Sequence, residues 1–419
     1  MLLLGAMSVV MILLQMNVLD YHVDNRDLPS SSVHETLSRS KSMSKARGVQ
    51  NTTTTNNNNN NQNTETKDKD MCDDMNDEDH GDDDLKPILK ILCQAGYNIS
   101  KDSTEIDRSV LPKWSDIMEG YGPPTIVGLD TCQKFRDTIP ANVRHMAPAG
   151  MFNSGTNLLH FLIQKNCNFR GLGPGRMSMR QSVPWGKHRL FSTRANHTAD
   201  HPMYQGLKHH DTLAVVVIRD PYTWLQSMCR QPYSAQYRHS KKTCPNLVPY
   251  PSDLANTKYT PVNVKYETGY RVAYDSMAHL WNEWYGDYIE FEEEEDTTAT
   301  TGASIHTTNM KTPDTPFLVL RMEDLIFHAD TVLPQMCECV GGKLRGSRVQ
   351  QITEIANRNA GIDRSSGKNS GLLRSIVNYG NITRRRDGYP AFQLVAAKEI
   401  LDSRLMNVMG YRYEEILTN

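Results

Sequence analysis

Three short apolar runs between residues 145 and 320 have the pattern of buried β-strands. They cover 145–152, 213–218 and 317–320, and each is followed by a polar turn and by further apolar positions. The middle run reads LAVVVI and is continuously apolar, as expected of a strand that is buried on both faces of a parallel sheet. Strands that alternate with helical segments predict an α/β fold, here a three-layer domain around a mainly parallel sheet.

The segments after these runs strengthen the prediction. Leu158 to Ile163 forms an apolar helical segment after the first run, and a helix is expected from about Ala329 to Val340 after the third. The Asp-Pro pair at 220–221 follows the middle run, and these are favoured residues at the cap and first position of a helix. We interpret Glu323 and Asp324, after the third run, as capping and sheet-edge residues rather than as catalytic carboxylates.

The first 19 residues form a separate apolar segment. Met1 to Leu19 is interrupted by Ser8, Gln15 and Asn17, and its length is close to the ~20 residues that a helix needs to cross a bilayer. We therefore expect a signal anchor. A cleaved signal peptide is the main alternative, although no basic residue precedes the apolar run and no A-x-A site closes it. A segment with neither role is the third possibility.

Residues 20–84 have the composition of an unfolded stem. They contain six consecutive asparagines and an acidic run over 64–84, with 11 acidic residues and two lysines. So few apolar side chains cannot offset the entropy that ordering would cost. We predict a flexible stem over 20–84, a lead-in segment over 85–144 and a folded domain over 145–419, with a surface insertion near 290–315. The chain has a net charge of −2, so the part after the stem is mildly basic and suits an anionic ligand.

Cysteine usage and glycosylation sequons are compatible with the secretory pathway. Among the eight cysteines, Cys229 and Cys244 would close a short loop that is rich in tyrosine and proline. Cys337 and Cys339 lie two apart on an expected helix, so they face different directions and should not bond each other. The sequence has no C-x-x-C pair, and a zinc site is therefore not expected. The N-x-S/T sequons begin at Asn51, Asn98, Asn196 and Asn381.

The turn after the first strand is a candidate anion site. It reads Asn153-Ser154-Gly155-Thr156-Asn157 and leads into the apolar helical segment. Gly155 allows a tight turn, and the N–H groups and the dipole at the start of a helix bind oxyanions. The hydroxyl groups of Ser154 and Thr156 can add hydrogen bonds. The sequence lacks the G-x-x-x-x-G-K-[S/T] loop of nucleoside triphosphatases, and an ordinary connection between strand and helix is the alternative.

A second candidate anion site follows the middle strand. Arg219 stands at the carboxyl end of that strand, where open α/β sheets bind their ligands. Ser227 follows two helical turns later. A cation and a hydroxyl group in these positions can hold a phosphate from two sides. The alternative is an arginine that pairs with a carboxylate inside the fold.

These features together resemble the sulfotransferase superfamily. Its 5′-phosphosulfate loop, P-K-S-G-T-T-x-L, is similar to Phe152–Leu159, and its strand-end arginine with a serine eight residues later is similar to Arg219 and Ser227. The family strand hRYEDLL resembles Leu320–Ile326, and the C-terminal L…LM…GY helix resembles the segment from Leu401 to Tyr411. The motifs follow in the family's order across almost the whole predicted domain, and they imply a P-loop-like sulfotransferase fold.

The resemblance implies an enzyme that transfers a sulfuryl group from 3′-phosphoadenosine 5′-phosphosulfate (PAPS) to a hydroxyl or amine acceptor. It implies no metal and no nucleic acid. Together with the expected anchor, the resemblance implies a single-pass Golgi membrane protein with a lumenal catalytic domain, or alternatively a secreted protein. The lumenal location favours a glycan over a protein or a small molecule as acceptor. The residues implied to bind PAPS are those of the two motifs and of a downstream basic loop: Asn153, Ser154, Gly155, Thr156, Asn157, Arg219, Ser227 and Arg385.

One departure from the family bears on catalysis. The family has a lysine before S-G-T that stabilises charge on the leaving phosphate, and Asn153 stands there in this chain. Lys187 and His188, in the stretch PWGKH, lie where the superfamily often places its catalytic base. We expect Lys187 to supply the missing charge and His188 to take the proton of the acceptor. The alternative is a non-catalytic lumenal nucleotide- or glycan-binding protein that keeps the fold.

Overall fold

The computed structural model describes Cys72 and most of 83–415, with gaps at 101–102, 104–105, 170–179, 197–207, 241–242, 254–255, 267–269, 290, 292–314 and 354–369. The expected signal anchor at 1–19, nearly all of the stem at 20–84 and most of the insertion near 290–315 lie outside the described residues. The described residues belong to one unit, 67–419. Within them, no helix is long and apolar enough to span a membrane.

The predicted parallel sheet is present, and the LAVVVI run is its central strand. β4 (Thr212–Ile218) lies between β2 (His145–Gly150) and β8 (Phe317–Arg321), and both pairings are parallel. β1 (Ile126–Val127) pairs with β8 in the antiparallel direction, so the strand order is β1-β8-β4-β2. Every residue of β4 is buried, as expected of a strand with helices on both sides.

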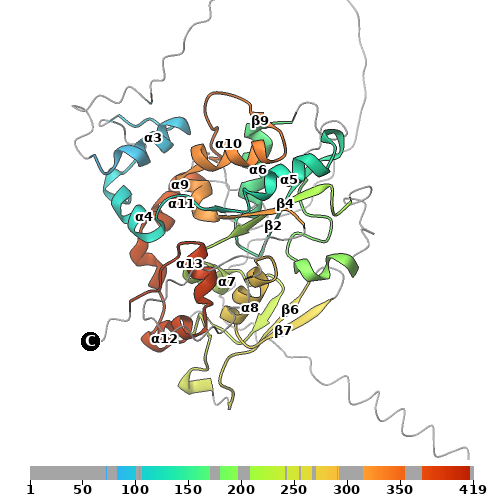
Figure 1. Ribbon diagram of the computed structural model, residues 1–419. Helices are drawn as coiled ribbons and strands as arrows, with labels where there is room; N and C mark the ends of the chain where they lie inside the picture. The colour runs from blue at the N-terminus through green and yellow to red at the C-terminus, as the bar shows by residue number, and fades with distance from the viewer. Residues whose placement is uncertain are drawn as a thin grey trace, which may run out of the picture. The chain divides into compact units, whose positions relative to one another are not determined.

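The helices form two groups on opposite sides of this sheet (Figure 1). In one group α10 contacts α5, α6 and α9, and in the other α8 contacts α7, α12 and α13. This arrangement confirms the α/β class predicted from the alternation of strands and helices. The helices are α3 (Lys86–Gln94), α4 (Trp114–Tyr121), α5 (Thr131–Thr138), α6 (Thr156–Asn166), α7 (Pro221–Arg230), α8 (Met277–Gly286), α9 (Met322–Phe327), α10 (Ala329–Cys339), α11 (Ser370–Gly380), the 3₁₀ segment η7 (Ile382–Arg386), α12 (Ala391–Ile400) and α13 (Ser403–Val408).

Two small antiparallel sheets are present that the sequence pattern does not predict. β5 (Ala235–Tyr237), β6 (Val262–Lys265) and β7 (Arg271–Tyr274) form a three-stranded sheet, and β3 (Cys167–Asn168) pairs with β9 (Lys343–Leu344). β6 alternates between buried and exposed residues, which is the period expected of a strand. Four residues are too few for that period to stand out in the sequence.

The lead-in segment 85–144 is part of the folded domain. Its strand β1 extends the main sheet, and Leu92 of α3 and Phe135 of α5 are buried in the same core as the strands. The disulfide between Cys132 and Cys339 joins α5 to α10. The segment therefore contributes directly to the core of the domain.

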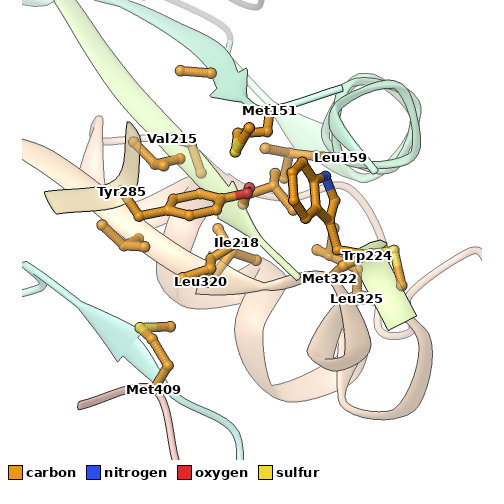
Figure 2. Packing of buried hydrophobic residues seen from close by; sticks show 14 of the residues in the cluster. Met151, Leu159, Val215, Ile218, Trp224, Tyr285, Leu320, Met322, Leu325 and Met409 are labelled. Atoms are coloured by element: carbon orange, nitrogen blue, oxygen red, sulfur yellow. The ribbon is translucent and has the colours of Figure 1, made fainter. Parts of the chain in front are cut away.

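Large aromatic side chains fill the core around β4. Figure 2 shows Tyr285 of α8 and Trp224 of α7 packed near this strand, with Leu159 of α6 close by. The Tyr285 hydroxyl donates to the main-chain oxygen of Val217 (3.0 Å), and Trp224 Nε1 donates to that of Phe152 (2.7 Å). Both buried side-chain donors thus form hydrogen bonds with main-chain oxygens. The bond from Trp224 anchors the loop that follows β2.

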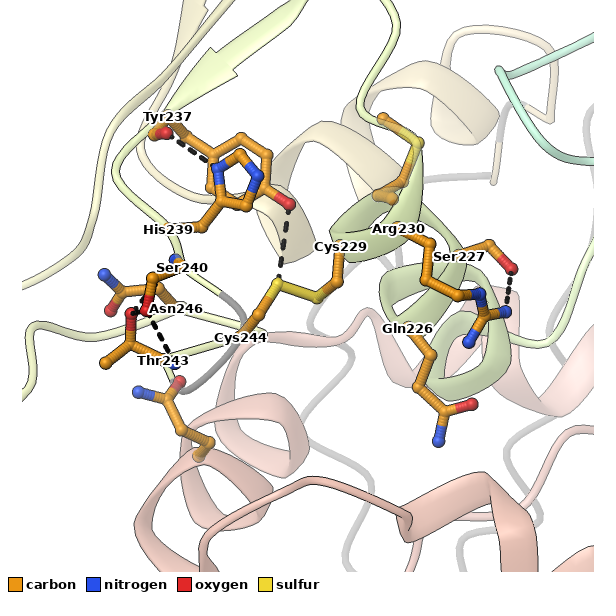
Figure 3. Close-up of a disulfide and its surroundings, with 12 residues drawn as sticks. Gln226, Ser227, Cys229, Arg230, Tyr237, His239, Ser240, Thr243, Cys244 and Asn246 are labelled. Atoms are coloured by element: carbon orange, nitrogen blue, oxygen red, sulfur yellow. Dashed lines mark hydrogen bonds between the residues drawn. A yellow bond between two sulfur atoms is a disulfide. The ribbon is translucent and has the colours of Figure 1, made fainter. Parts of the chain in front are cut away.

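All eight cysteines, each of them a described residue, form disulfides. Cys229 bonds Cys244 and closes the predicted loop (Figure 3). The prediction that Cys337 and Cys339 do not bond each other is confirmed, because they bond different partners. The remaining pairs are Cys72–Cys93, Cys132–Cys339 and Cys167–Cys337.

Candidate active site

The carboxyl ends of β2, β4 and β8 lie at one edge of the sheet. Gly150 pairs with Val217, and Ile218 pairs with Arg321, so the loops after the three strands begin side by side. Ligands of open α/β sheets bind at this edge. The sequence motifs after the three strands therefore start from neighbouring positions.

The loop between β2 and α6 takes a tight conformation that depends on residue type. Asn153 and Gly155 have φ angles of 61° and 92°, in the left-handed region that asparagine and glycine tolerate. A Cβ atom at Gly150 would lie 2.5 Å from Ser154 Oγ and 2.9 Å from Val217 O. Glycine at 150 therefore lets the loop fold back onto the end of the sheet.

The loop presents main-chain N–H groups, while its hydroxyl groups are buried. The N–H of Leu159 donates to Gly155 O (3.0 Å), so the N–H groups at the start of α6 have no acceptor within the helix. Ser154 is buried and its hydroxyl donates to Met151 O (2.8 Å), and Thr156 is also buried. An anion at this loop would meet the main-chain N–H groups, and Ser154 stabilises the turn.

Lys187 reaches this loop from the segment between β3 and β4. Its Nζ donates to Asn157 Oδ1 (3.0 Å) in the first turn of α6. Its main-chain oxygen accepts a hydrogen bond from the N–H of Gly150 (2.9 Å), so the segment follows the end of β2. A positive charge therefore lies beside the helix N-terminus, although position 153 is an asparagine.

His188 is fixed against the same strand end. Its Nδ1 lies 2.6 Å from Gly150 O, and since a carbonyl oxygen can only accept, Nδ1 carries the proton and Nε2 keeps its lone pair. The ring packs against Phe152 with 4.7 Å between centroids. Burial and, to a smaller extent, the nearby Lys187 charge lower the pKa of His188 to about 4, while the bond to Gly150 opposes the shift. The imidazole is thus neutral and a proton acceptor near pH 7.

Arg219 joins the loop to α7. Its buried guanidinium donates to Asn153 O (2.9 Å), to Thr223 Oγ1 (3.1 Å) and to Thr223 O (2.9 Å). These bonds use three of its five N–H groups. The guanidinium also lies over the Tyr379 ring, 4.8 Å from its centroid. Arg219 has no carboxylate partner among the ion pairs of the described residues, so a bound anion would be its counter-charge.

Ser227 lies beside a further arginine that the sequence motifs did not indicate. Arg230 Nη2 donates to Ser227 Oγ (3.0 Å), as Figure 3 shows, which leaves the hydroxyl proton available to donate. The pKa of Arg230 is lowered by burial and by the charges of Arg219 and Arg374. The charges of Arg219 and Arg374 therefore act on the guanidinium that contacts this serine. Helical spacing could have indicated Arg230, because residues three apart share a helix face, whereas Arg374 comes from α11, far along the chain.

Asn153 points away from the N-terminus of α6. Its Nδ2 donates to Gln231 O (2.8 Å) at the carboxyl end of α7. A lysine at 153 would lose this bond. Asn153 contributes to the candidate site through its main-chain oxygen, which orients Arg219.

Arg385 lies in a different cluster from the other predicted residues. It is buried, and its guanidinium contacts Asp220 (2.7 Å) and Glu414 (2.7 Å) and donates to Arg412 O (2.6 Å). These contacts, with the bond from Nε to Asp220, use four of the five N–H groups of the guanidinium. Its binding to the nucleotide stays a prediction. As it stands, Arg385 joins the end of β4 to the C-terminal segment.

No family model, curated protein or solved structure compared with this chain matches it. Within the described residues, no group of three or more His, Cys, Asp or Glu side chains is arranged to hold a metal ion. The function is therefore inferred from the geometry of the site itself. That geometry combines a neutral histidine, a helix N-terminus with a lysine, and two arginines, Arg219 and Arg230, that form no ion pair with a carboxylate in the described part of the chain.

Proposed function

We propose that this chain is a PAPS-dependent sulfotransferase with a P-loop-like sulfotransferase fold. The observation that carries the proposal is the contact of Lys187 Nζ with Asn157 Oδ1. It puts a cation, contributed by a separate segment, beside the α6 N-terminus where the family's loop lysine is missing. The two anion-binding regions are also joined through Arg219, as expected if one nucleotide carries both a 5′-phosphosulfate and a 3′-phosphate.

The reaction is an in-line transfer. His188 Nε2 takes the proton of the acceptor hydroxyl or amine, and the acceptor atom forms a bond to sulfur. The bond between sulfur and the bridging oxygen of the 5′-phosphate breaks, and 3′-phosphoadenosine 5′-phosphate (PAP) leaves with the electron pair. Lys187 and the N–H groups of α6 stabilise the charge that develops on PAP, which is the main electrostatic contribution.

The two ends of the nucleotide have different partners in this scheme. The 5′-phosphosulfate lies at the loop 153–157, and the 3′-phosphate lies between Arg219, Ser227 and Arg230. A charge-assisted bond to phosphate is about twice as strong as a neutral one. The arginine group therefore favours 3′-phosphorylated nucleotides over those without this phosphate.

Cellular location is part of the proposal. Four disulfides, including pairs that join distant parts of the domain, favour an oxidising compartment. We propose a Golgi glycoprotein with a lumenal catalytic domain, held by the N-terminal segment, or its secreted form. Protease protection of the chain in intact microsomes, lost on adding detergent, is the expected result, and digestion without detergent would contradict it.

The transfer assay separates the enzyme from the main alternative. The full-length chain is incubated with ³⁵S-labelled PAPS and a panel of glycans, tyrosine peptides and small phenols. Label on any acceptor, lost in the Lys187→Ala and His188→Ala variants, is the expected result. Tight PAP binding without transfer would instead support a non-catalytic lumenal nucleotide-binding protein. Transfer of phosphate from ATP would support a kinase, a class disfavoured by the missing G-K-[S/T].

A further inference from the structure

An exposed aromatic residue stands beside the candidate active site. Tyr233 follows α7 and is 44% exposed, a value that among the large apolar and aromatic residues of the described chain is equalled by Tyr270 and exceeded by Val110. Its ring stacks on Phe152, with 5.6 Å between centroids and 14° between planes. Phe152 in turn packs against the ring of His188. One aromatic ring therefore separates Tyr233 from the proposed proton acceptor.

The backbone holds Tyr233 in an unfavourable conformation. Its φ angle is 53°, in the left-handed region that a bulky residue rarely adopts and that costs roughly 1–3 kcal/mol. Three hydrogen bonds fix its neighbours: Asn153 Nδ2 to Gln231 O (2.8 Å), the N–H of Ala235 to Pro232 O (3.0 Å), and the N–H of Lys265 to Ser234 O (3.2 Å). The surrounding structure thus imposes a conformation that glycine or asparagine would adopt at less cost.

Strain of this kind is concentrated at functional sites. The Tyr233 ring contributes little to the core, since nearly half of it is exposed. Asn153, the residue that departs from the family motif, is one of the groups that hold it in place. The loop that would bind the phosphosulfate therefore also positions an aromatic surface.

We propose that Tyr233 and Phe152 form the acceptor platform of the enzyme and that the acceptor is a carbohydrate whose sugar ring stacks on Tyr233. This inference rests on the proposed sulfotransferase function. A sugar ring has an apolar C–H face and a hydrated rim, which suits a tyrosine with an apolar body and a polar tip. A small phenol would gain its affinity from enclosure in an apolar pocket, and a ring that is 44% exposed does not enclose it.

The test measures carbohydrate binding and protein stability in the same variants. The full-length chain, saturated with PAP, is applied to a glycan array of neutral and acidic hexose, hexosamine and uronic acid units. For the saccharide that binds best, Tyr233→Asn should weaken binding at least about tenfold, while Tyr233→Phe stays within about twofold. Phe392→Ala, which removes a 38% exposed ring on α12, is the matched control and should not change binding.

The stability readout separates a binding role from a structural one. Since asparagine tolerates a positive φ, Tyr233→Asn should unfold at the same or a higher temperature than the wild type. Unchanged saccharide affinity in Tyr233→Asn, or no saccharide bound by the wild type, would overturn the platform. Saccharide binding that depends on Tyr233 in a chain that does not bind PAP would keep the platform and reject the sulfotransferase.

Discussion

Two groups of charged residues lie at the same edge of the parallel sheet and differ in how their charges are paired. The first contains Arg219 and Arg230, which form no ion pair among the described residues and donate hydrogen bonds to neutral oxygens. In the second, Arg321 pairs with Asp324 and Arg385 pairs with Asp220 and Glu414. Each group includes an arginine at a strand end, Arg219 after β4 and Arg321 in β8, so position in the fold alone does not separate binding residues from structural ones.

The difference follows from the free energy of a buried charge. A buried cation with matched carboxylates is neutralised within the fold, and it needs no ligand. Desolvation is the largest cause of the lowered pKa of Arg230, and repulsion by the charges of Arg219 and Arg374 adds to it. An anion would relieve that repulsion. The account therefore predicts that variants in the paired group lose stability and variants in the unpaired group lose binding or turnover.

The largest expected effect is in the paired group. Arg321 is fully buried and bonds Asp324 through Nε and Nη2. Arg321→Met leaves an unpaired buried carboxylate and should lower the free energy of unfolding by about 3–5 kcal/mol. Lys187→Met, at a half-buried position, should change it by less than about 1 kcal/mol. Chemical denaturation measures both, and equal losses would contradict the structural role of the paired group.

The second effect concerns the pH dependence of stability. Burial and the neighbouring Asp220 raise the pKa of Glu323 to about 7 from an ordinary 4.5. The folded state therefore binds this proton more tightly than the unfolded state, and stability falls as pH rises from about 4.5 through 7. The wild type should lose about 2–3 kcal/mol more than Glu323→Gln between pH 5 and pH 8. Denaturation at the two pH values tests this, and parallel losses would mean that Glu323 is ionised throughout.

The third effect is on turnover, at Lys187 and His188. Lys187→Ala and His188→Ala should each lower kcat by at least ~10²-fold with nearly unchanged PAP affinity, because both act on the transition state. The acidic limb of kcat/KM should lie near pH 4 in the wild type, where His188 becomes protonated, and should disappear in His188→Ala. Wild-type turnover in both variants would mean that another residue is the base.

A fourth, smaller effect tests the rearranged loop. Asn153→Lys removes the bond from Asn153 Nδ2 to Gln231 O and puts a long side chain at a φ of 61°. We expect it to lower stability by about 1–2 kcal/mol and not to restore turnover in Lys187→Ala. Rescue of that variant by the added lysine would show that the loop merely lacks a cation.

The sequence predicted the elements whose signals are local. The apolar run of β4 predicts a buried strand, and the Asp-Pro pair before α7 predicts the start of a helix. Asp220 does cap α7 by accepting a hydrogen bond from the N–H of Thr223 (2.9 Å). The proximity of Lys187 to the loop was also predicted. The C-terminal segment that resembles the family's L…LM…GY helix is not a single helix. Leu401 caps the end of α12, and α13 begins two residues later.

Contacts between residues that are far apart in the chain could not be predicted from local sequence patterns. Arg385 carries the same charge as Arg374 and is 11 residues away, but it meets Asp220 and Glu414 while Arg374 lies near Arg230. The packing of α11 and η7 against α7 decides which of the two arginines pairs with a carboxylate. No spacing in the sequence encodes that choice.

The most direct test of the account is nucleotide selectivity at the unpaired arginines. Titration calorimetry of the full-length chain should show tighter binding of PAP than of adenosine 5′-monophosphate, because only PAP has a 3′-phosphate for Ser227 and Arg230. Arg230→Ala and Ser227→Ala should weaken PAP binding by about tenfold, equivalent to 1.4 kcal/mol, and leave binding of the monophosphate within about twofold. Equal affinity of the wild type for the two nucleotides would contradict the proposal that this edge of the sheet is a PAPS site.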